Sequence, residues 1–206
     1  MSAALPEIQS PGWRAGVSPV DWDTRLLADL AAQLAPRTAL DVGTGSGYIT
    51  VALAGQGVQC TATDINPAAL AQAREFAAAR GSTIDFVRSD LFDQVHGRFD
   101  LIVFNPPYGH TGSSGAARLE YLKSLVPKEN PIVRRVVYEF VRPGRLRLID
   151  RFLLQALDHL TPGGSVLLLA HRRELPLATG WCCDVMASRD EFRALRLTPE
   201  NNREPR

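Results

Sequence analysis

Three glycines at alternate positions, Gly43, Gly45 and Gly47, constrain the fold of this 206-residue chain more than any other feature. They follow a short apolar run, Thr38–Val42, that is typical of a buried parallel strand. A helical pattern begins directly after them, at Tyr48. Glycine tolerates positive φ angles and lets a ligand approach the backbone closely. The sequence therefore predicts a strand, a tight turn and a helix that together leave room for a ligand.

Strand-like and helix-like segments alternate through the rest of the chain. Further strands are predicted at residues 59–64, 84–87, 99–104, 165–170, 182–187 and 192–197, with a turn at 162–164. Helices are predicted at 23–34, at 48–54, from Pro67 to about Arg80 and at 146–160, the first with Asp23 or Ser18 as its cap. Such alternation indicates a parallel sheet covered on both faces. We expect an α/β, Rossmann-like, doubly wound fold with a mostly parallel seven-stranded sheet.

The length of the chain allows one compact domain. We expect residues 1–17, with their prolines and glycines, to form a flexible lead-in, and residues 18–206 to form the domain. Residues 109–145 show no clear strand and are expected to cover the site as a lid. Their seven basic and three acidic residues could meet phosphate or an acidic protein surface, or form an ordinary solvated face.

The composition argues against several classes of protein. A net charge of +1 predicts no strong overall attraction to nucleic acid or membrane. No apolar run approaches the roughly 20 residues that cross a bilayer, and the first residues do not resemble a signal peptide. Cys60, Cys182 and Cys183 form neither a zinc-binding pattern nor an ordinary disulfide pattern. We expect a cytoplasmic protein without a metal site.

Right-handed crossovers would bring the carboxyl ends of the strands to one edge of the sheet, where ligands bind. Asp64 could hold the two hydroxyls of a ribose or cap the following helix. Asp90 could accept a hydrogen bond from an adenine amino group while Leu91 packs on the ring, or it could lie in a solvated turn. Asp41 could order the glycine backbone or face a ligand's ammonium group. The Gly-x-Gly-x-Gly spacing favours an amino acid carboxylate over a pyrophosphate at the helix terminus.

The segment Asn105-Pro106-Pro107-Tyr108 is the most specific chemical signal. The two prolines hold the backbone extended and end the preceding strand. The side-chain carbonyl of Asn105 and a proline main-chain carbonyl can then accept hydrogen bonds from one planar NH2 group, on which Tyr108 can stack. The alternative is a turn that only ends the strand. We interpret the segment as the catalytic motif, Asn105, Pro106, Pro107 and Tyr108, for transfer of a group to a planar nitrogen.

Four motifs carry a family resemblance. They are Asp-Val-Gly-Thr-Gly-Ser-Gly at 41–47, Thr-Asp-Ile-Asn-Pro at 63–67, Ser-Asp-Leu-Phe at 89–92 and Phe-Asp-Leu-Ile-Val-Phe-Asn-Pro-Pro-Tyr at 99–108. They resemble class I S-adenosylmethionine (SAM)-dependent methyltransferases, and specifically the HemK-like N5-glutamine and N6-adenine group. The resemblance implies SAM as cofactor and the glutamine amide of a release factor as acceptor. The candidate SAM-binding residues are Thr24, Asp41, Gly43, Thr44, Gly45, Gly47, Asp64, Ile65, Asp90, Leu91 and Asn105.

The chain departs from the group in two ways. Too few residues precede Asp41 for the N-terminal helical domain of the common bacterial enzymes, so it looks like the short members, which often need a small zinc-binding partner. It also has Trp22-Asp23-Thr24 where those members show Glu-Asp-Ser/Thr. Other acceptors stay open: N6 of adenine in RNA or DNA, or a small metabolite. The non-enzymatic alternative is a SAM-binding scaffold subunit.

Overall fold

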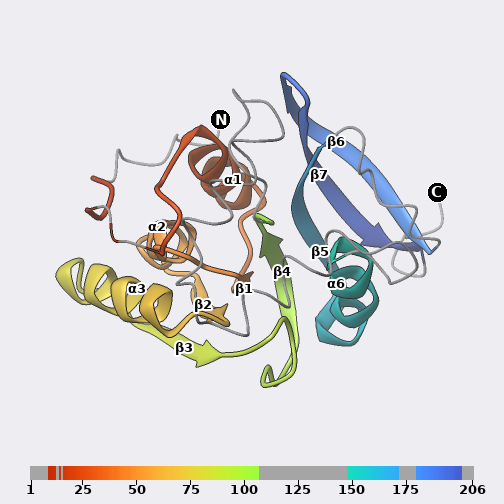
Figure 1. Ribbon diagram of the computed structural model, residues 1–206. Coiled ribbons are helices and arrows are strands. Elements are labelled where there is room, and N and C mark those ends of the chain that lie inside the picture. The colour runs from red at the N-terminus through yellow and green to blue at the C-terminus, as the bar shows by residue number, and fades with distance from the viewer. Residues whose placement is uncertain (1–8, 13, 15, 107–147, 172–179, 201–206) are drawn as a thin grey trace.

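A computed structural model describes residues 9–12, 14, 16–106, 148–171 and 180–200. Its centre is one seven-stranded sheet with the strand order β3-β2-β1-β4-β5-β7-β6 (Figure 1). The strands are β1 (Thr38–Val42), β2 (Gln59–Asp64), β3 (Ile84–Arg88), β4 (Phe99–Phe104), β5 (Leu160–His171), β6 (Trp181–Arg189) and β7 (Phe192–Pro199). Neighbours among the first five strands are parallel, and β7 pairs antiparallel with both β5 and β6. The predicted mostly parallel sheet is confirmed.

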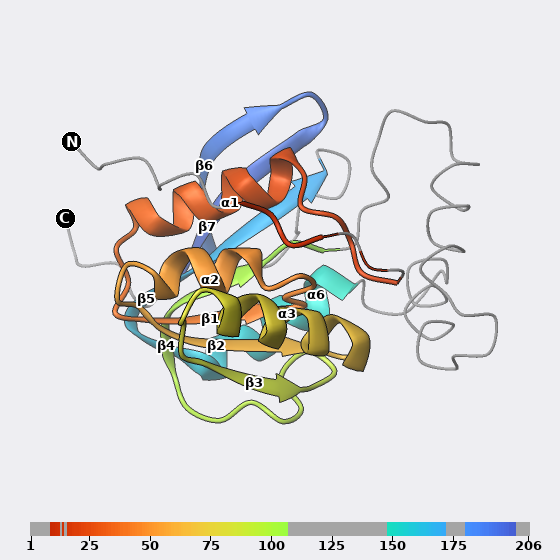
Figure 2. The same ribbon diagram turned by 90° about the vertical axis from the view of Figure 1, so that its left-hand side faces the viewer.

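Helices cover both faces of this sheet, as predicted. They are α1 (Trp22–Gln33), α2 (Tyr48–Ala54), α3 (Pro67–Ala79) and α6 (Leu148–Ala156), the last followed by the short 3-10 helix η1 (Leu157–His159). The first three lie on one side of the sheet and α6 on the other (Figures 1 and 2). On the α6 side, Phe152 is fully buried and its ring stacks on Phe104 of β4, with 4.4 Å between centroids. This contact packs α6 against the end of β4, directly before Asn105.

Two helix starts show how local sequence sets the elements. The side chain of Asp21 accepts a hydrogen bond from the amide of Trp22, so Asp21 caps α1 and the predicted caps, Asp23 and Ser18, are wrong. At α3, Asn66 accepts from the amide of Ala68, and Pro67 occupies the first turn as predicted. Capping by Asp21 leaves the carboxylate of Asp23 available for another contact.

The start of β5 differs from the predicted turn at 162–164. The strand begins at Leu160, which pairs with Phe99, and its register then shifts so that Leu101 pairs with Ser165. Gly164 lies close to the neighbouring strand, because a Cβ atom there would come within 2.9 Å of the Phe99 carbonyl oxygen. The glycines therefore allow an irregular strand start where the sequence pattern indicated a turn.

The described part of the N-terminal segment lies along α3. The amide of Gln72 donates to the carbonyl of Gly12 at 2.7 Å, and Arg14 forms a 2.6 Å ion pair with Glu75. The flexibility of residues 1–17 and the boundaries of the domain stay predictions, and the predicted lid at 109–145 lies outside the described residues.

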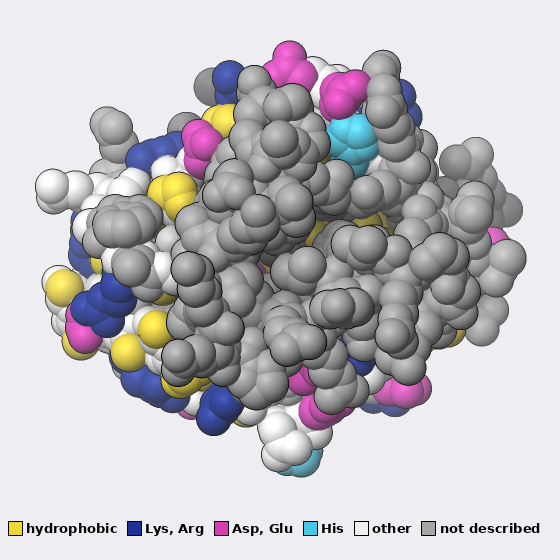
Figure 3. Space-filling view, in the orientation of Figure 1, with side chains coloured by type: hydrophobic (Ala, Val, Ile, Leu, Met, Phe, Trp, Pro, Cys, Tyr) yellow, Lys and Arg dark blue, Asp and Glu magenta, His cyan; other side chains and the backbone are white. Residues whose placement is uncertain are grey.

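Basic side chains lie over α3 in the space-filling view (Figure 3). Two arginines at α3 cover aromatic rings: the guanidinium of Arg74 lies 5.5 Å from the centre of the Phe86 ring, and that of Arg80 lies 5.5 Å from the centre of the Phe76 ring. These arginines shield apolar rings from water. Within the described ranges, every helix falls short of the length and apolar character that a bilayer span requires.

Candidate active site

The carboxyl ends of four parallel strands bring the predicted site together. Val42 of β1 stands beside Thr63 of β2 and Phe104 of β4, and Asp64 of β2 stands beside Arg88 of β3. The residues that follow these positions therefore share one edge, with neighbouring strands about 4.8 Å apart. The strand order reverses between β1 and β4, which opens a crevice at this point.

The glycine loop has positive φ angles at all three predicted glycines, 70° at Gly43, 56° at Gly45 and 80° at Gly47. A Cβ atom on Gly47 would lie 2.8 Å from the Cβ of Ala73, so α2 and α3 can pack closely only with glycine there. A Cβ atom on Gly45 would meet no described residue within 4 Å. The loop thus has one glycine that serves packing and one that leaves open space beside the backbone, as close approach of a ligand requires.

Asp64 joins the end of β2 to this loop. Its Oδ2 atom accepts from the amide of Gly45 at 3.0 Å, and its Oδ1 atom accepts from the amide of Asn66 at 2.8 Å. Because Asn66 caps α3, the alternative role of Asp64 as the helix cap is excluded. Burial raises the pKa of Asp64 above its ordinary value, although the amides of Asn66, Gly45 and Ile65 favour the ionised form. Each carboxylate oxygen retains a lone pair for a further donor, such as a hydroxyl.

Asp41 lies beneath the loop and is only 2% exposed. The hydroxyl of Thr44 donates to its Oδ2 atom at 2.7 Å. Burial raises the pKa of Asp41 to about 7; the Thr44 hydrogen bond opposes this shift and the nearby Asp64 carboxylate adds to it. Of the two predicted roles, this geometry supports ordering of the loop, because the carboxylate is held against Thr44.

The turn after β3 carries Asp90 and Leu91. The amide of Ser89 donates to the carbonyl of Asp64 at 3.1 Å, which ties this turn to the end of β2. Leu91 is buried and has a φ of 50°, a conformation that is unfavourable for leucine and is common at functional sites. Asp90 is half-buried, and no described residue hydrogen-bonds to its carboxylate. These features suit the predicted contact with an adenine ring.

Asn105 follows β4 and is held by the start of α1. Its Nδ2 atom donates to Oδ2 of Asp23 at 3.3 Å and to Oγ1 of Thr24 at 3.4 Å. The amide of Thr24 donates to Oδ1 of Asp23 at 2.6 Å, which fixes the carboxylate. The Oδ1 atom of Asn105 is buried and has no hydrogen-bond partner among the described residues. A buried acceptor without a donor costs about 1–3 kcal/mol, so this oxygen can accept a hydrogen bond from a bound donor.

Asp23 is the site residue that sequence reasoning missed. The sequence indicated it only as a cap and as part of the Asp-Thr element, and it assigned Thr24 to the cofactor. In the structure both side chains contact Asn105, 82 and 81 residues away. One signal in the sequence could have indicated this role. Asp23 and Thr24 place a carboxylate beside a hydroxyl at the start of α1, and neither is needed as the helix cap because Asp21 has that role.

Trp22 packs the start of α1 against the last two strands. Its ring packs edge-on against Phe192 of β7 with centroids 5.9 Å apart, and the Arg189 guanidinium lies 4.8 Å from its centre. The first residue of α1 is thus anchored on the β6-β7 hairpin, and the next two hold Asn105.

Pro107 and Tyr108 of the predicted motif lie outside the described residues, whereas Pro106 is buried at the end of β4. In the part of the chain that the structure describes, His, Cys, Asp and Glu side chains form no group of three that could hold a metal ion. Cys60, Cys182 and Cys183 are free thiols.

Comparisons with known proteins agree with this geometry. Residues 16–126 match the family model described as methyltransferase small domain. A relative from Methanocaldococcus jannaschii named protein N5-glutamine methyltransferase is 32% identical over 148 residues, which cover 71% of this chain and 68% of the relative. The release factor glutamine methyltransferase of Deinococcus radiodurans is 31% identical over 183 residues, which cover 84% of this chain and 62% of that protein.

A solved structure shows the same fold. The T. thermophilus 16S rRNA N2 G1207 methyltransferase, in complex with AdoMet and guanosine, superposes with a TM-score of 0.63 at 21% identity. The match covers 89% of this chain and 44% of that one. The chain therefore belongs to the family of S-adenosylmethionine-dependent methyltransferases described as methyltransferase small domain.

Proposed function

We propose that this chain transfers the methyl group of SAM to the side-chain amide nitrogen of a protein glutamine. The observation that carries the proposal is the buried, unpartnered Oδ1 atom of Asn105. Asp23 and Thr24 occupy the Nδ2 side of the same amide, so the oxygen side is left for a donor. A primary amide NH2 is such a donor, and names of the relatives from M. jannaschii and D. radiodurans point to glutamine.

The residues at the crevice fit SAM. The open side of Gly45, the carboxylate of Asp64 and the carboxylate of Asp90, to which no described residue hydrogen-bonds, follow one another after β1, β2 and β3. SAM supplies an activated methyl group there: a carbon–nitrogen bond forms, the carbon–sulfur bond breaks with its electron pair left on sulfur, and the acceptor nitrogen loses a proton to solvent. Thr24, Asp41, Gly43, Thr44, Gly47, Ile65 and Leu91 remain proposed members of this binding site.

Asn105 contributes positioning. A hydrogen bond from the acceptor NH2 to Oδ1 would hold the nitrogen in one orientation, which lowers the entropic part of the barrier. Since Nδ2 of Asn105 is fixed by two partners, the oxygen is fixed too, and no rearrangement accompanies binding of the acceptor. In this proposal, two further groups act on the acceptor NH2 together with Oδ1. A main-chain carbonyl at Pro106-Pro107 accepts a second hydrogen bond, and the ring of Tyr108 stacks on the planar group.

Asn105→Ala tests the role of this amide. We expect transfer to fall about 100-fold or more, because an oriented side-chain acceptor for the NH2 group is removed. SAM affinity, measured by calorimetry, should change less than about threefold. Full transfer by the variant would refute the assignment.

Asp23→Ala is the matched variant for positioning. It leaves Asn105 in place but removes one partner of Nδ2, so kcat should fall about tenfold with the KM for SAM unchanged. Asp29→Ala, on the same helix, is the control and should leave both constants unchanged. An Asp23→Ala enzyme with normal kcat would show that Thr24 alone holds the amide.

Radiolabelled SAM identifies the acceptor. The purified chain should label a release factor at glutamine, and replacement of that glutamine by asparagine should abolish labelling. Total RNA, DNA and a pool of small metabolites serve as the other arms, because the amino group of a base could also donate to Asn105. Labelling of a nucleic acid or metabolite alone would assign the alternative acceptor, and SAM binding without any transfer would support a scaffold subunit.

The need for a small zinc-binding activator, implied by the family resemblance, stays a proposal. The same assay with and without such a protein decides it, because an obligate activator raises transfer from background.

A further inference from the structure

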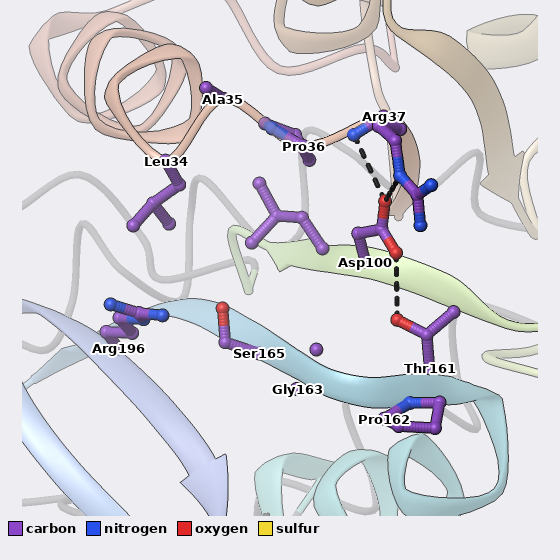
Figure 4. A pocket seen from close by; sticks show the side chains of 12 residues that line it. Leu34, Ala35, Pro36, Arg37, Asp100, Thr161, Pro162, Gly163, Ser165 and Arg196 are labelled. Carbon is purple, nitrogen blue, oxygen red and sulfur yellow. Dashed lines mark hydrogen bonds and ion pairs between the residues drawn. The ribbon is translucent and has the colours of Figure 1, made fainter. Parts of the chain in front are cut away.

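A cavity of about 380 Å³ lies at the amino-terminal edge of the sheet, opposite the edge that carries Asn105 (Figure 4). The segment after α1, the starts of β4 and β5 and one side chain of β7 line it, and it is open to solvent on one side. Its main lining residues are Leu34, Pro36, Arg37, Asp100, Ser165 and Arg196. This volume lies within the range of small-molecule sites, about 300–1,000 Å³.

One pair of charges in the wall is already satisfied. The Oδ1 atom of Asp100 accepts from the hydroxyl of Thr161 at 2.8 Å, and its Oδ2 atom accepts from the backbone amide of Arg37 at 3.1 Å and from its side chain at 3.4 Å. Burial opposes ionisation, but these hydrogen bonds, that of Thr38 and the Arg37 charge hold the pKa of Asp100 below its ordinary value. The pair Asp100–Arg37 therefore offers a ligand little net charge.

Arg196 and Ser165 have no such partners. The Nε atom of Arg196 is buried without a hydrogen-bond partner. Within the described residues no carboxylate lies within 4.0 Å of its guanidinium, although Asp184 stands opposite it on β6. Ser165 is 4% exposed, and no described residue hydrogen-bonds to its hydroxyl, whose oxygen faces the cavity in Figure 4. The half-buried guanidinium of Arg196 and the hydroxyl of the buried Ser165 thus line one cavity, and neither has a described carboxylate or carbonyl as its acceptor.

We propose that this cavity binds a small organic carboxylate through Arg196 and Ser165. A carboxylate accepts several hydrogen bonds at once and pairs with a guanidinium in two parallel contacts. The single uncompensated positive charge matches a monoanion better than a phosphate dianion. Leu34, Pro36 and Leu101 form an apolar wall that suits a short hydrocarbon chain on the ligand.

Binding of 3-methylbutanoate tests the proposal, with the neutral isostere 3-methylbutanamide as control. The carboxylate should bind with a dissociation constant on the order of 1 mM. Amide-proton NMR shifts should centre on residues 163–165 and 196, and the neutral amide should bind about tenfold more weakly. Stronger binding of inorganic phosphate, or no shifts with any probe, would overturn the proposal.

Two variants and a matched control locate the site. Ser165→Ala and Arg196→Met should each weaken carboxylate binding about tenfold, whereas Arg193→Met, on the same strand but outside the cavity, should not. Each of the first two removes a polar group without a partner, so its unfolding temperature should equal or exceed that of the parent. Unchanged binding in Ser165→Ala and Arg196→Met, or a lowered unfolding temperature for Ser165→Ala, would contradict the assignment.

Discussion

Ionisation of Asp41 opposes folding. Its pKa rises from 3.8 to about 7 because the carboxyl group is buried. An acid with a raised pKa in the folded state stabilises the fold below its unfolded pKa and loses that contribution as the pH rises. A shift of about three units corresponds to about 4 kcal/mol, lost between about pH 4 and about pH 7.

Asp41→Asn should remove this dependence. The asparagine oxygen can still accept from Thr44, so the loop contact is kept. The stability of the variant relative to the parent should increase from about pH 4 to about pH 7 and then level off. Urea unfolding of both proteins across this range measures the difference. Parallel stability profiles would contradict the raised pKa.

Substitution of Gly45 has two expected effects that can be measured separately: backbone strain lowers stability, and loss of space for the ligand lowers SAM affinity. Gly45→Ala places a side chain at a φ of 56° and should cost about 1–2 kcal/mol of stability. Its Cβ would enter space that no protein atom occupies within 4 Å, so we expect SAM to bind about tenfold or more weakly. Calorimetry with SAM measures this change.

Gly81→Ala is the matched control. Gly81 has a φ of 64°, and a Cβ there also meets nothing within 4 Å, but it lies in the turn between α3 and β3. The same loss of stability is expected with unchanged SAM affinity. Equal SAM affinity in the Gly45→Ala and Gly81→Ala variants would mean that the cofactor does not approach Gly45.

At the scale of elements, α1 connects three parts of the molecule. Its first residue, Trp22, packs on the β6-β7 hairpin, and Asp23 and Thr24 hold Asn105. Leu34, which directly follows its last residue, lines the cavity at the amino-terminal edge of the sheet. The helix thus contacts Asn105 at one edge of the sheet and leads into the cavity at the other.

Trp22→Ala should affect both stability and catalysis. Loss of the contacts with Phe192 and Arg189 should cost about 2 kcal/mol, since the ring is only partly buried. Displacement of Asp23 should lower kcat about tenfold while SAM affinity stays close to that of the parent. Trp22→Phe keeps an aromatic ring on the hairpin and should restore most of both. If kcat stays normal in Trp22→Ala, α1 is held in place by its other contacts.

At the scale of the whole molecule, β7 completes the core. It lies between β5 and β6, and its residues Ala194, Leu195 and Leu197 are at most 1% exposed. Loss of each buried leucine costs about 2–5 kcal/mol, against a total stability of roughly 5–15 kcal/mol. The last strands are therefore part of the fold and not an appendage.

Removal of residues 180–206 should abolish cooperative folding. The truncation also exposes the backbone edge of β5, which favours aggregation. Circular dichroism during thermal unfolding and size-exclusion chromatography measure both effects. Removal of residues 201–206 alone retains all seven strands and serves as the control. A truncated chain that unfolds cooperatively near the parent's temperature would contradict this account.

The sequence alone determined the alternation of strands and helices and the residues that end each strand. These features depend on short-range patterns: the apolar run before Gly43, Pro67 in the first turn of a helix, and Asn105 followed by two prolines. The parallel topology then placed Asp64, Asp90 and Asn105 at one edge. The family resemblance of the four motifs added the prediction that this edge binds SAM and a planar nitrogen acceptor.

The tertiary structure alone decided the contacts between distant segments. Sequence patterns do not indicate which side chains meet across the sheet. The structure was therefore needed to show that β7 lies between β5 and β6 and that Asp23 accepts a hydrogen bond from Asn105. The Asp21 cap was missed because several polar residues near the start of α1 were equally suitable. Whether a buried donor or acceptor finds a partner depends on how elements pack, because burial is a property of the folded chain; the Asn105 amide oxygen, an acceptor, and the Ser165 hydroxyl, a donor, are examples.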